Sequence, residues 1–347
     1  MNIQNSLNWT PPENWLQIRT IDAHTGGEPL RIILDGFPKL PGDTILTRRR
    51  IAKSEYDHLR RALMWEPRGH ADMYGCLVTP PVTKDADFGV LFLHNEGWST
   101  MCGHGIIGVT KVALETGMIE SQGEETVVRI DSPAGLITAT AHMKGPTVEY
   151  VSFLNVPSFV LALDEKVNVP ELGKVRYDLA FGGAFYAYVN AADFGLSCTP
   201  EEHDRLIEIG MQIKRAVMAA RPIEHPFEQD LGFLYGTIFI APPLSDDVDS
   251  RNVCIFAEGE VDRSPTGTGV SGRMALHYAR GEIEMGAPYV IESIVGSQFT
   301  GRVTKETTFG PHLGIIPEVS GTAHITGVHT YVIDPDDPLR DGFIFRH

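Results

Sequence analysis

Short runs of β-branched and aromatic residues, separated by Gly, Pro and Asp, dominate the hydrophobic pattern of the chain. Such runs predict short strands, among them TVVRI (126–130), LITATA (136–141), VEYVSFLNV (148–156), YAYVN (186–190) and GTIFIA (236–241). Clear helical periodicity is confined to a few segments, notably 54–64 and 200–220. The second opens with Thr, Pro and two Glu at 199–202, the usual signals of a helix start. The pattern predicts a strand-rich α+β fold, not the regular alternation of a doubly wound protein.

Two similar units recur along the chain, each a strand followed by a glycine-rich turn and a helix. One starts with the apolar segment 88–98, and the other starts with 252–260. When the two units are aligned with a constant offset of 164 residues, Cys102 corresponds to Thr266 and His104 corresponds to Thr268. The glycines that match at this offset are Gly103 with Gly267, Gly105 with Gly269, Gly108 with Gly272, and the helix-ending Gly117 with Gly281. These matches favour two similar half-molecules over two unrelated glycine-rich turns.

The length of 347 residues exceeds the usual size of one hydrophobic core, which favours two domains. We expect the boundary between the two domains at the turn 131–135. The predicted first domain comprises 1–132 together with 325–347, and the predicted second domain comprises 133–324. The strand-like segment 321–335 follows the second unit and is expected to return and pair with the first domain.

The charge balance argues against nucleic acid and anionic membrane as partners. The chain has 29 Lys and Arg against 45 Asp and Glu, which gives a formal net charge of −16. Nucleic acid and anionic membranes bind proteins through clustered basic residues. The arginine run at 48–50 is expected to be a solvated face.

We expect no secretory signal, because the start has neither a basic nor an apolar region. No stretch approaches the roughly 20 apolar residues of a membrane span.

The cysteines are too few and too scattered for a disulfide framework, so we expect reduced thiols in a cytoplasmic protein. Cys76, Cys198 and Cys254 lie in apolar or strand-like runs, which predicts buried and inert thiols. Cys102 differs because it stands at the glycine-flanked start of a helix.

Each predicted helix start offers backbone N–H groups without intrahelical partners and a partial positive charge. Two such ends facing each other would clamp a small anion such as a substrate carboxylate. The amides expected to bind it are those of Gly103, His104, Gly267 and Thr268. Asp262 would lie close to this clamp, either to pair with a substrate ammonium or iminium group or as an ordinary turn residue.

A thiol at a helix mouth is expected to have its pKa lowered from about 8.5 to roughly 3.5–7.5. Cys102 could then act as a nucleophile or as a general base, with His104 as a positive neighbour or a proton relay. The alternative is an inert thiol. A metal site at this pair is disfavoured because no second ligand pair is evident. The loop SPTGTG lacks the features of ATP- and NAD-binding loops, so we expect no metal and no cofactor.

At these residues the sequence resembles the proline racemase family. The blocks that carry the resemblance are DAHTGGEPLRI (22–32), EPRGHADMYG (66–75), NEGWSTMCGHG (95–105), FGGAFYAYV (181–189), DRSPTGTG (262–269) and ITGVHTYVIDPDDP (325–338). They follow the family's order over nearly the whole chain. The resemblance implies the fold of diaminopimelate epimerase, in which two pseudo-symmetric domains each wrap strands around a central helix. It also implies that the site lies between these domains.

Racemases and epimerases of this family look like two-base enzymes, in which one cysteine lies on each face of the substrate Cα. This chain departs from that pattern, because Thr266 stands where they carry the second cysteine. A threonine hydroxyl is too weak an acid and too weak a base for that role. Family members with this Cys/Thr pair look like trans-3-hydroxy-L-proline dehydratases, and this chain resembles them. The resemblance implies dehydration of that substrate. Our hypothesis is that Cys102 removes the α-proton while Asp262 holds the ring nitrogen, that the 3-hydroxyl leaves, and that Δ1-pyrroline-2-carboxylate forms.

Two other functions stay open from the sequence. One is a racemase or epimerase that acts on proline or 4-hydroxyproline with a single base. The other is a non-catalytic imino-acid binding protein, which needs the clamp but no reactive thiol. His24, His70 and Asp72 lie in matching blocks and are expected to support the site. A homodimer is the default expectation for an enzyme of this kind.

Overall fold

The computed structural model describes residues 3–345 of the chain. Its strands are β1 (Leu16–Thr25), β2 (Glu28–Asp35), β3 (Tyr74–Thr79), β4 (Phe88–His94), β5 (Glu125–Ser132), β6 (Gly135–Lys144), β7 (Thr147–Leu154), β8 (Ser158–Val169), β9 (Gly173–Phe181), β10 (Phe185–Asn190), β11 (Leu234–Ala241), β12 (Ser250–Phe256), β13 (Glu260–Val261), β14 (Tyr289–Glu292), β15 (Gln298–Phe309), β16 (His312–Gly321) and β17 (Ala323–Ile333). Its helices are α1 (Ile3–Leu7), α2 (Ile45–Glu55), α3 (Asp57–Met64), α4 (Gly103–Glu115), α5 (His203–Ala220) and α6 (Gly267–Ala279), with short 3₁₀ turns at Ala191–Phe194, Pro200–Glu202 and Gln229–Leu231. The predicted strand-rich α+β class is confirmed.

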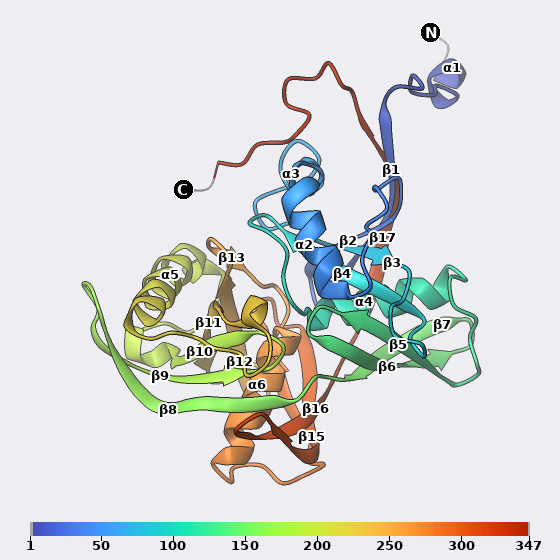
Figure 1. Ribbon diagram of the computed structural model, residues 1–347. Coiled ribbons are helices and arrows are strands. Elements are labelled where there is room, and N and C mark those ends of the chain that lie inside the picture. The colour runs from blue at the N-terminus through green and yellow to red at the C-terminus, as the bar shows by residue number, and fades with distance from the viewer. Residues whose placement is uncertain (1–2, 346–347) are drawn as a thin grey trace.

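The first structural unit wraps a ring of strands around α4 (Figure 1). The strands pair in the order β17–β1–β2–β3–β4–β5–β6–β7, and β7 pairs with the end of β16, which leads directly into β17. The pairs β2–β3 and β4–β5 are parallel. All residues of α4 from Gly103 to Leu114 are buried. A helix that is buried on every side needs such an enclosure.

The second unit repeats this arrangement around α6. Its strands pair in the order β8–β9–β10–β11–β12–β14–β15–β16, and the ring closes because β16 also pairs with β8. The pairs β10–β11 and β12–β14 are parallel. The helix packs chiefly on β8, β15, β16 and β9, and its residues from Gly267 to Leu276 are buried.

The internal repeat predicted from the sequence is present in the structure. α4 and α6 each have 13 residues, and their first residues, Gly103 and Gly267, are related by the offset found in the sequence. Each helix follows a fully buried strand, β4 in one unit and β12 in the other. The prediction of two pseudo-symmetric, strand-rich units around central helices is therefore confirmed.

The domain boundary expected at 132/133 falls in a tight turn, between Ser132 of β5 and Gly135 of β6. β6 leads into β7, and both strands pack on α4 of the first unit. By the helix that each strand covers, the chain passes from the first unit to the second after Leu154, and the domain boundary at 132/133 stays a prediction. The returning segment pairs as predicted: β17 lies beside β1 along its whole length (Figure 1).

Two helices replace the single helix predicted at 54–64. α2 and α3 are separated at Tyr56, which leaves the helical conformation (φ −123°, ψ 17°). The pattern did not predict α2 because most of its residues are polar, and only Ile45, Arg49 and Ala52 are buried. The helix predicted at 200–220 is confirmed, with a 3₁₀ turn before α5.

The arginine run at 48–50 is not wholly a solvated face, so that expectation is wrong for its central residue. Arg49 is buried, and its guanidinium donates hydrogen bonds to the carbonyls of Trp98 (3.0 Å) and Ser99 (3.2 Å). These backbone acceptors compensate for the loss of water around the charge. The neighbouring Arg50 is exposed, and its side chain pairs with Asp230 of the second unit (2.7 Å).

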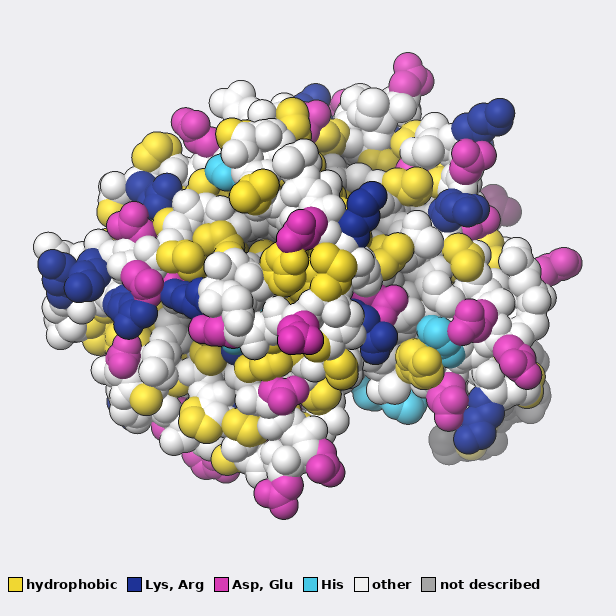
Figure 2. Space-filling view, turned by 90° about the horizontal axis from the view of Figure 1, so that it is seen from below, with side chains coloured by type: hydrophobic (Ala, Val, Ile, Leu, Met, Phe, Trp, Pro, Cys, Tyr) yellow, Lys and Arg dark blue, Asp and Glu magenta, His cyan; other side chains and the backbone are white. Residues whose placement is uncertain are grey.

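The surface shows mixed charge on the face seen in Figure 2, where acidic and basic side chains are interspersed over the whole view. No basic patch gathers there of the kind that nucleic acid requires. Among residues 3–345, no helix is long and apolar enough to cross a membrane.

The N-termini of α4 and α6 touch each other where the two units meet. A Cβ placed on Gly103 would lie 2.6 Å from the Cα of Gly267, and a Cβ placed on Gly267 would lie 2.7 Å from the Cα of Gly103. These separations leave no room for a side chain, so only glycine permits the contact. Two helix ends with partial positive charge therefore meet at one point.

We expect Gly103→Ala to lower the free energy of unfolding by about 1–3 kcal/mol, the usual cost of forcing extra atoms into a packed interior. Gly97→Ala is the matched control, because nothing lies within 4 Å of a Cβ at that position. Urea unfolding measures both variants. A Gly103→Ala protein as stable as the Gly97→Ala protein would contradict the close helix contact.

Candidate active site

A closed cavity of about 20 Å³ lies where the two helix N-termini meet. Its wall contains every residue that the sequence singled out for catalysis or binding: Cys102, Gly103, His104, Asp262, Thr266, Gly267 and Thr268. The other wall residues are Tyr74, Met101, Tyr186, Tyr235, Cys254 and Phe256. A cavity of this size holds about one water molecule. The cavity must therefore widen before a ligand with a five-membered ring can enter.

Cys102 is the N-cap residue of α4, with an extended backbone (φ −147°, ψ 110°). Its sulfur accepts a hydrogen bond from the amide of Gly105 (3.2 Å) and lies 3.2 Å from Nδ1 of His104. The thiol thus lies at the helix mouth, where the sequence pattern places it.

Burial raises the pKa of the Cys102 thiol well above its ordinary value, and the nearby carboxylates of Asp262 and Glu28 raise it further. Hydrogen bonds from the Gly105 amide and the Tyr74 hydroxyl lower this pKa, but by less than burial raises it. The expectation of a lowered thiol pKa is therefore wrong for the closed site. Removing water from a fully enclosed thiolate costs more than one helix N-terminus supplies.

His104 is buried beside the thiol, and burial lowers the pKa of its imidazole to about 3. The ring is therefore neutral at physiological pH. The expectation that His104 is a positively charged neighbour of Cys102 is wrong for the closed site. Of the two roles expected for His104, the proton relay remains. The ring donates a hydrogen bond to the carbonyl of Pro29. The Cys102 sulfur lies 3.2 Å from Nδ1 and 3.7 Å from Nε2, and we assign the donor to Nε2 because Nδ1 is the nearer nitrogen to the thiol. Nδ1 is then an acceptor directed at the thiol.

Thr266 precedes α6 as Cys102 precedes α4, but its side chain is held differently. Its hydroxyl donates to Oδ2 of Asp262 (2.8 Å), while Oδ1 accepts from the amide of Ser264 (2.8 Å). Burial raises the pKa of Asp262 to about 6. Thr266 also has a φ of 67°, a value that β-branched residues avoid. Such strain costs about 1–3 kcal/mol and is concentrated at functional sites.

The residues of the predicted anion clamp all lie in the cavity wall. Their amides belong to the first turns of α4 and α6, where helix geometry leaves them without intrahelical acceptors. Both turns are anchored from outside: the Thr25 hydroxyl donates to the carbonyl of His104 (2.9 Å), and the hydroxyls of Tyr186 and Thr268 are 2.7 Å apart.

The sequence did not point to the aromatic part of the wall. Tyr74 comes from β3, its ring meets that of His104 edge-on (4.8 Å between centroids), and its hydroxyl lies 2.7 Å from that of Ser99. Tyr74 and Tyr186 lie inside family-like blocks, which is a weak signal for them. Tyr235 lies in none of these blocks, so the sequence offered no signal for it.

All four cysteines are free and buried, in agreement with the expectation of reduced thiols. Burial raises the pKa of the Cys76 and Cys198 thiols, as expected for inert groups. Cys254 was also predicted to be inert, yet it lies in the cavity wall beside Thr266. In the described part of the chain, no three or more His, Cys, Asp or Glu side chains are placed to hold a metal ion.

The three expected support residues do not line the cavity. Asp72 forms an ion pair across the two units with Arg263 (2.8 Å), whose amide donates to the buried Glu28 (2.7 Å). His70 accepts a hydrogen bond from the amide of Asp72 (3.2 Å), and His24 accepts one from the turn that precedes β2. The contacts of Arg263 join the two units beside the cavity, whereas those of His70 and His24 stay within the first unit.

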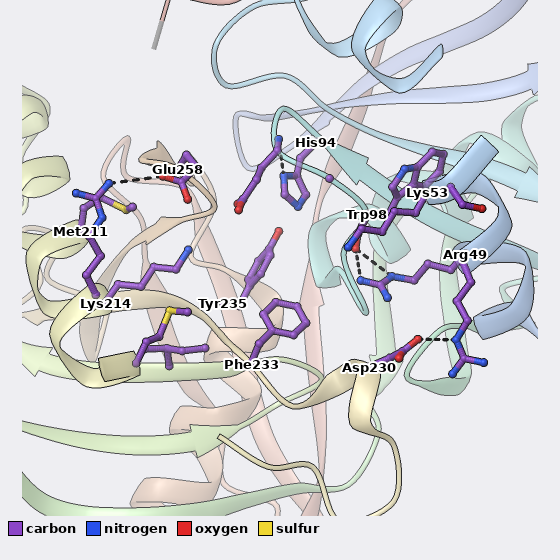
Figure 3. A pocket seen from close by; sticks show the side chains of 17 residues that line it. Arg49, Lys53, His94, Trp98, Met211, Lys214, Asp230, Phe233, Tyr235 and Glu258 are labelled. Carbon is purple, nitrogen blue, oxygen red and sulfur yellow. Dashed lines mark hydrogen bonds and ion pairs between the residues drawn. The ribbon is translucent and has the colours of Figure 1, made fainter. Parts of the chain in front are cut away.

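A larger cleft of about 810 Å³ adjoins the closed cavity (Figure 3). Tyr235 lines both spaces, and His94 lies beside it on the cleft side. The charged residues of the cleft are Arg49, Arg50, Lys53, Lys214 and Arg215 against Glu96, Asp230 and Glu258. In a chain with a net charge of −16, this local excess of positive charge would attract a carboxylate.

Comparison with known proteins identifies relatives along almost the whole chain. The sequence profile described as proline racemase matches residues 20–344. A trans-3-hydroxy-L-proline dehydratase from Colwellia psychrerythraea is 50% identical over 341 residues, which cover 97% of this chain and 96% of the relative. A 3-hydroxyproline 2-epimerase from Burkholderia multivorans is 48% identical over 329 residues, which cover 95% of this chain and 98% of the relative.

A solved structure of a hydroxyproline epimerase from Agrobacterium vitis, with bound trans-4-hydroxy-L-proline, is similar with a TM-score of 0.89 and 33% identity. The match covers 95% of this chain and 96% of that chain. This likeness confirms the two-unit fold that the sequence resemblance implied.

Asp262→Asn is expected to stabilise the protein at high pH. The Asp262 pKa of about 6 in the folded protein exceeds the value of about 3.9 in an unfolded chain. The stability linked to this carboxyl is therefore complete below about pH 4 and is lost as the pH rises through 6. We expect the variant to be more stable than the wild type by roughly 1–3 kcal/mol at pH 8 and equally stable near pH 4. Urea unfolding at several pH values measures this, and two parallel stability curves would contradict the raised pKa.

Proposed function

The chain belongs to the proline racemase family, and we propose that it dehydrates trans-3-hydroxy-L-proline to Δ1-pyrroline-2-carboxylate without a cofactor. The observation that carries this proposal is the asymmetry of the two helix starts, with Cys102 at one and Thr266 at the other. Racemisation needs a proton donor on the second face of Cα, whereas elimination needs proton removal from one face. A threonine hydroxyl is a poor donor and a poor base at neutral pH.

The wall of the cavity suits a zwitterion. We assign the substrate carboxylate to the amides of Gly103, His104, Gly267 and Thr268, where the positive ends of two helices meet. We assign the ring ammonium to Asp262. Each carboxylate oxygen of Asp262 already accepts one hydrogen bond from the protein and has capacity for another.

Binding of the zwitterion opposes the effects that keep the Cys102 thiol protonated in the empty site. The ring ammonium offsets the charge of Asp262, one of the groups that raise the thiol pKa. Nδ1 of the neutral His104 lies 3.2 Å from the sulfur and accepts the thiol proton. The thiolate therefore forms in the complex rather than in the free protein.

The reaction then needs one ring face only. In trans-3-hydroxy-L-proline the α-hydrogen and the 3-hydroxyl lie on the same face. The Cys102 thiolate takes the α-proton, the C–H electron pair forms the C2–C3 double bond, and the C3–O bond breaks. The new thiol or the protonated His104 gives a proton to the leaving hydroxyl, which departs as water. The enamine product tautomerises to Δ1-pyrroline-2-carboxylate, while the helix amides stabilise the charge that grows on the carboxylate.

Epimerisation is the second candidate function, because relatives of similar identity carry both dehydratase and epimerase names. A passive imino-acid binding protein is the third. A substrate panel separates them: purified protein is incubated with trans-3-hydroxy-L-proline, trans-4-hydroxy-L-proline and L-proline. We expect the ketimine product from the first compound alone. Inversion of 4-hydroxyproline without any ketimine would identify an epimerase, and binding without turnover would identify a passive binder.

Cys102→Ser is expected to lower kcat for dehydration by about 10²–10⁴-fold, the usual contribution of a general base. Cys198→Ala is the control, because that thiol is buried but does not line the cavity. We expect it to retain the wild-type kcat. Undiminished turnover by a folded Cys102→Ser protein would refute the role given to this thiol.

A further inference from the structure

Tyr235 lines both the cavity at the helix ends and the larger cleft, and Figure 3 shows its side chain in the wall of the cleft. It belongs to β11 of the second unit. Its ring stacks on Phe256 (5.4 Å between centroids) and meets the rings of Tyr186 and His94 edge-on (5.9 and 5.8 Å). Aromatic neighbours on several sides restrict the ring to one orientation and so fix the position of its hydroxyl.

The Tyr235 hydroxyl is buried, and it has no hydrogen-bond partner among residues 3–345. The side chain is only 7% exposed. The Tyr74 hydroxyl interacts with it only weakly, outside good hydrogen-bond geometry, and pairs with Ser99 at 2.7 Å. Burial of a hydroxyl without a hydrogen bond is unfavourable, so this group is expected to bind a ligand atom that completes its hydrogen bonding.

The other hydroxyls of the cavity wall all have partners. Tyr186 pairs with Thr268, and Thr266 donates to Asp262. Within the described chain, Tyr235 is therefore the one wall hydroxyl without a hydrogen bond of good geometry, which leaves it available to a ligand.

The position of Tyr235 also suits the geometry of the reaction. Burial raises the pKa of its phenol well above the ordinary value, and Cys102 is among the nearby groups that raise it further. The phenol therefore keeps its proton and can donate a hydrogen bond. The 3-hydroxyl shares a ring face with the α-hydrogen, so it lies on the side of the ring that faces Cys102, and Tyr235 lines the same small cavity as Cys102.

We propose that Tyr235 recognises the ring hydroxyl of the substrate by donating a hydrogen bond to its oxygen. This inference rests on the proposed dehydration and deepens it by naming the group that binds the leaving hydroxyl. The proton of the water formed still comes from Cys102 or His104, and Tyr235 keeps its own. As charge grows on the departing oxygen, the hydrogen bond strengthens and favours C–O cleavage. With proline as ligand, closure would bury the Tyr235 hydroxyl unpaired, which disfavours that ligand.

The test compares two ligands in protein that cannot turn them over. Calorimetry measures the affinity of the Cys102→Ser protein for trans-3-hydroxy-L-proline and L-proline, with and without Tyr235→Phe. We expect the parent to prefer the hydroxylated ligand by about 10-fold or more, and Tyr235→Phe to reduce this preference to about 2-fold or less. In protein with Cys102 intact, Tyr235→Phe should lower kcat/KM for dehydration by about 10–10³-fold.

Tyr177→Phe is the matched control, since Tyr177 is a buried tyrosine of the same unit that does not line the cavity. Equal affinity of the parent for both ligands, or a preference that survives Tyr235→Phe, would overturn the assignment. Equal weakening of both ligands by Tyr235→Phe would also overturn it, because that result indicates a purely structural role. If the wild type forms no ketimine while Tyr235→Phe still removes the preference, dehydration fails and hydroxyl recognition stands.

Discussion

The close contact between two buried helix N-termini is the constraint on which the rest of the structure depends. α4 and α6 are each enclosed by a ring of strands, and they touch through the backbones of Gly103 and Gly267. Cys102 and Thr266 immediately precede these glycines, so the contact brings a thiol and a hydroxyl into one cavity from distant parts of the chain. A side chain at either glycine would separate the helix ends and widen the site.

Enclosure by the two units also sets the electrostatics of the cavity. Burial raises the pKa of Cys102, of Asp262 and of Glu28, and it lowers the pKa of His104. The empty site therefore holds a neutral thiol, a neutral imidazole and carboxyl groups that are weaker acids than in water, although Asp262, with a pKa of about 6, is still mostly ionised at neutral pH. A zwitterionic ligand supplies the opposite charge to the carboxylates and to the helix ends. In the proposed mechanism the reactive thiolate is therefore a property of the complex.

The parts of the site that are local in sequence could be predicted from it. Residues 102–104 and 262–268 lie in glycine-rich turns before helices, and such turns carry a recognisable signal. Tyr74, Tyr235 and Cys254 come from strands, and they reach the cavity only through the way the sheets close. An alternating or fully apolar strand pattern indicates that a residue is buried, but not which residues it will face.

Local reasoning also failed where the answer depends on burial by distant segments. The thiol pKa was predicted to fall because the helix mouth is a local feature, but the cavity is closed by both units, and burial outweighs the helix end. Arg49 was expected in solvent, but the carbonyls that bind it belong to the loop after β4, far along the chain. Both errors arise from tertiary enclosure, which no short stretch of sequence encodes.

A single base on one ring face leaves a stereochemical signature in the unreacted substrate. Trans-3-hydroxy-L-proline is turned over in deuterium oxide, and the residual substrate is recovered before completion. Chiral chromatography with mass spectrometry then reads both the deuterium content and the configuration at C2. Proton abstraction by Cys102 alone predicts residual substrate that keeps its L configuration, whether or not it carries deuterium, beside the ketimine product. Accumulation of the deuterated C2 epimer at a rate similar to that of the ketimine would contradict the account, because it requires a proton donor on the face that Thr266 occupies.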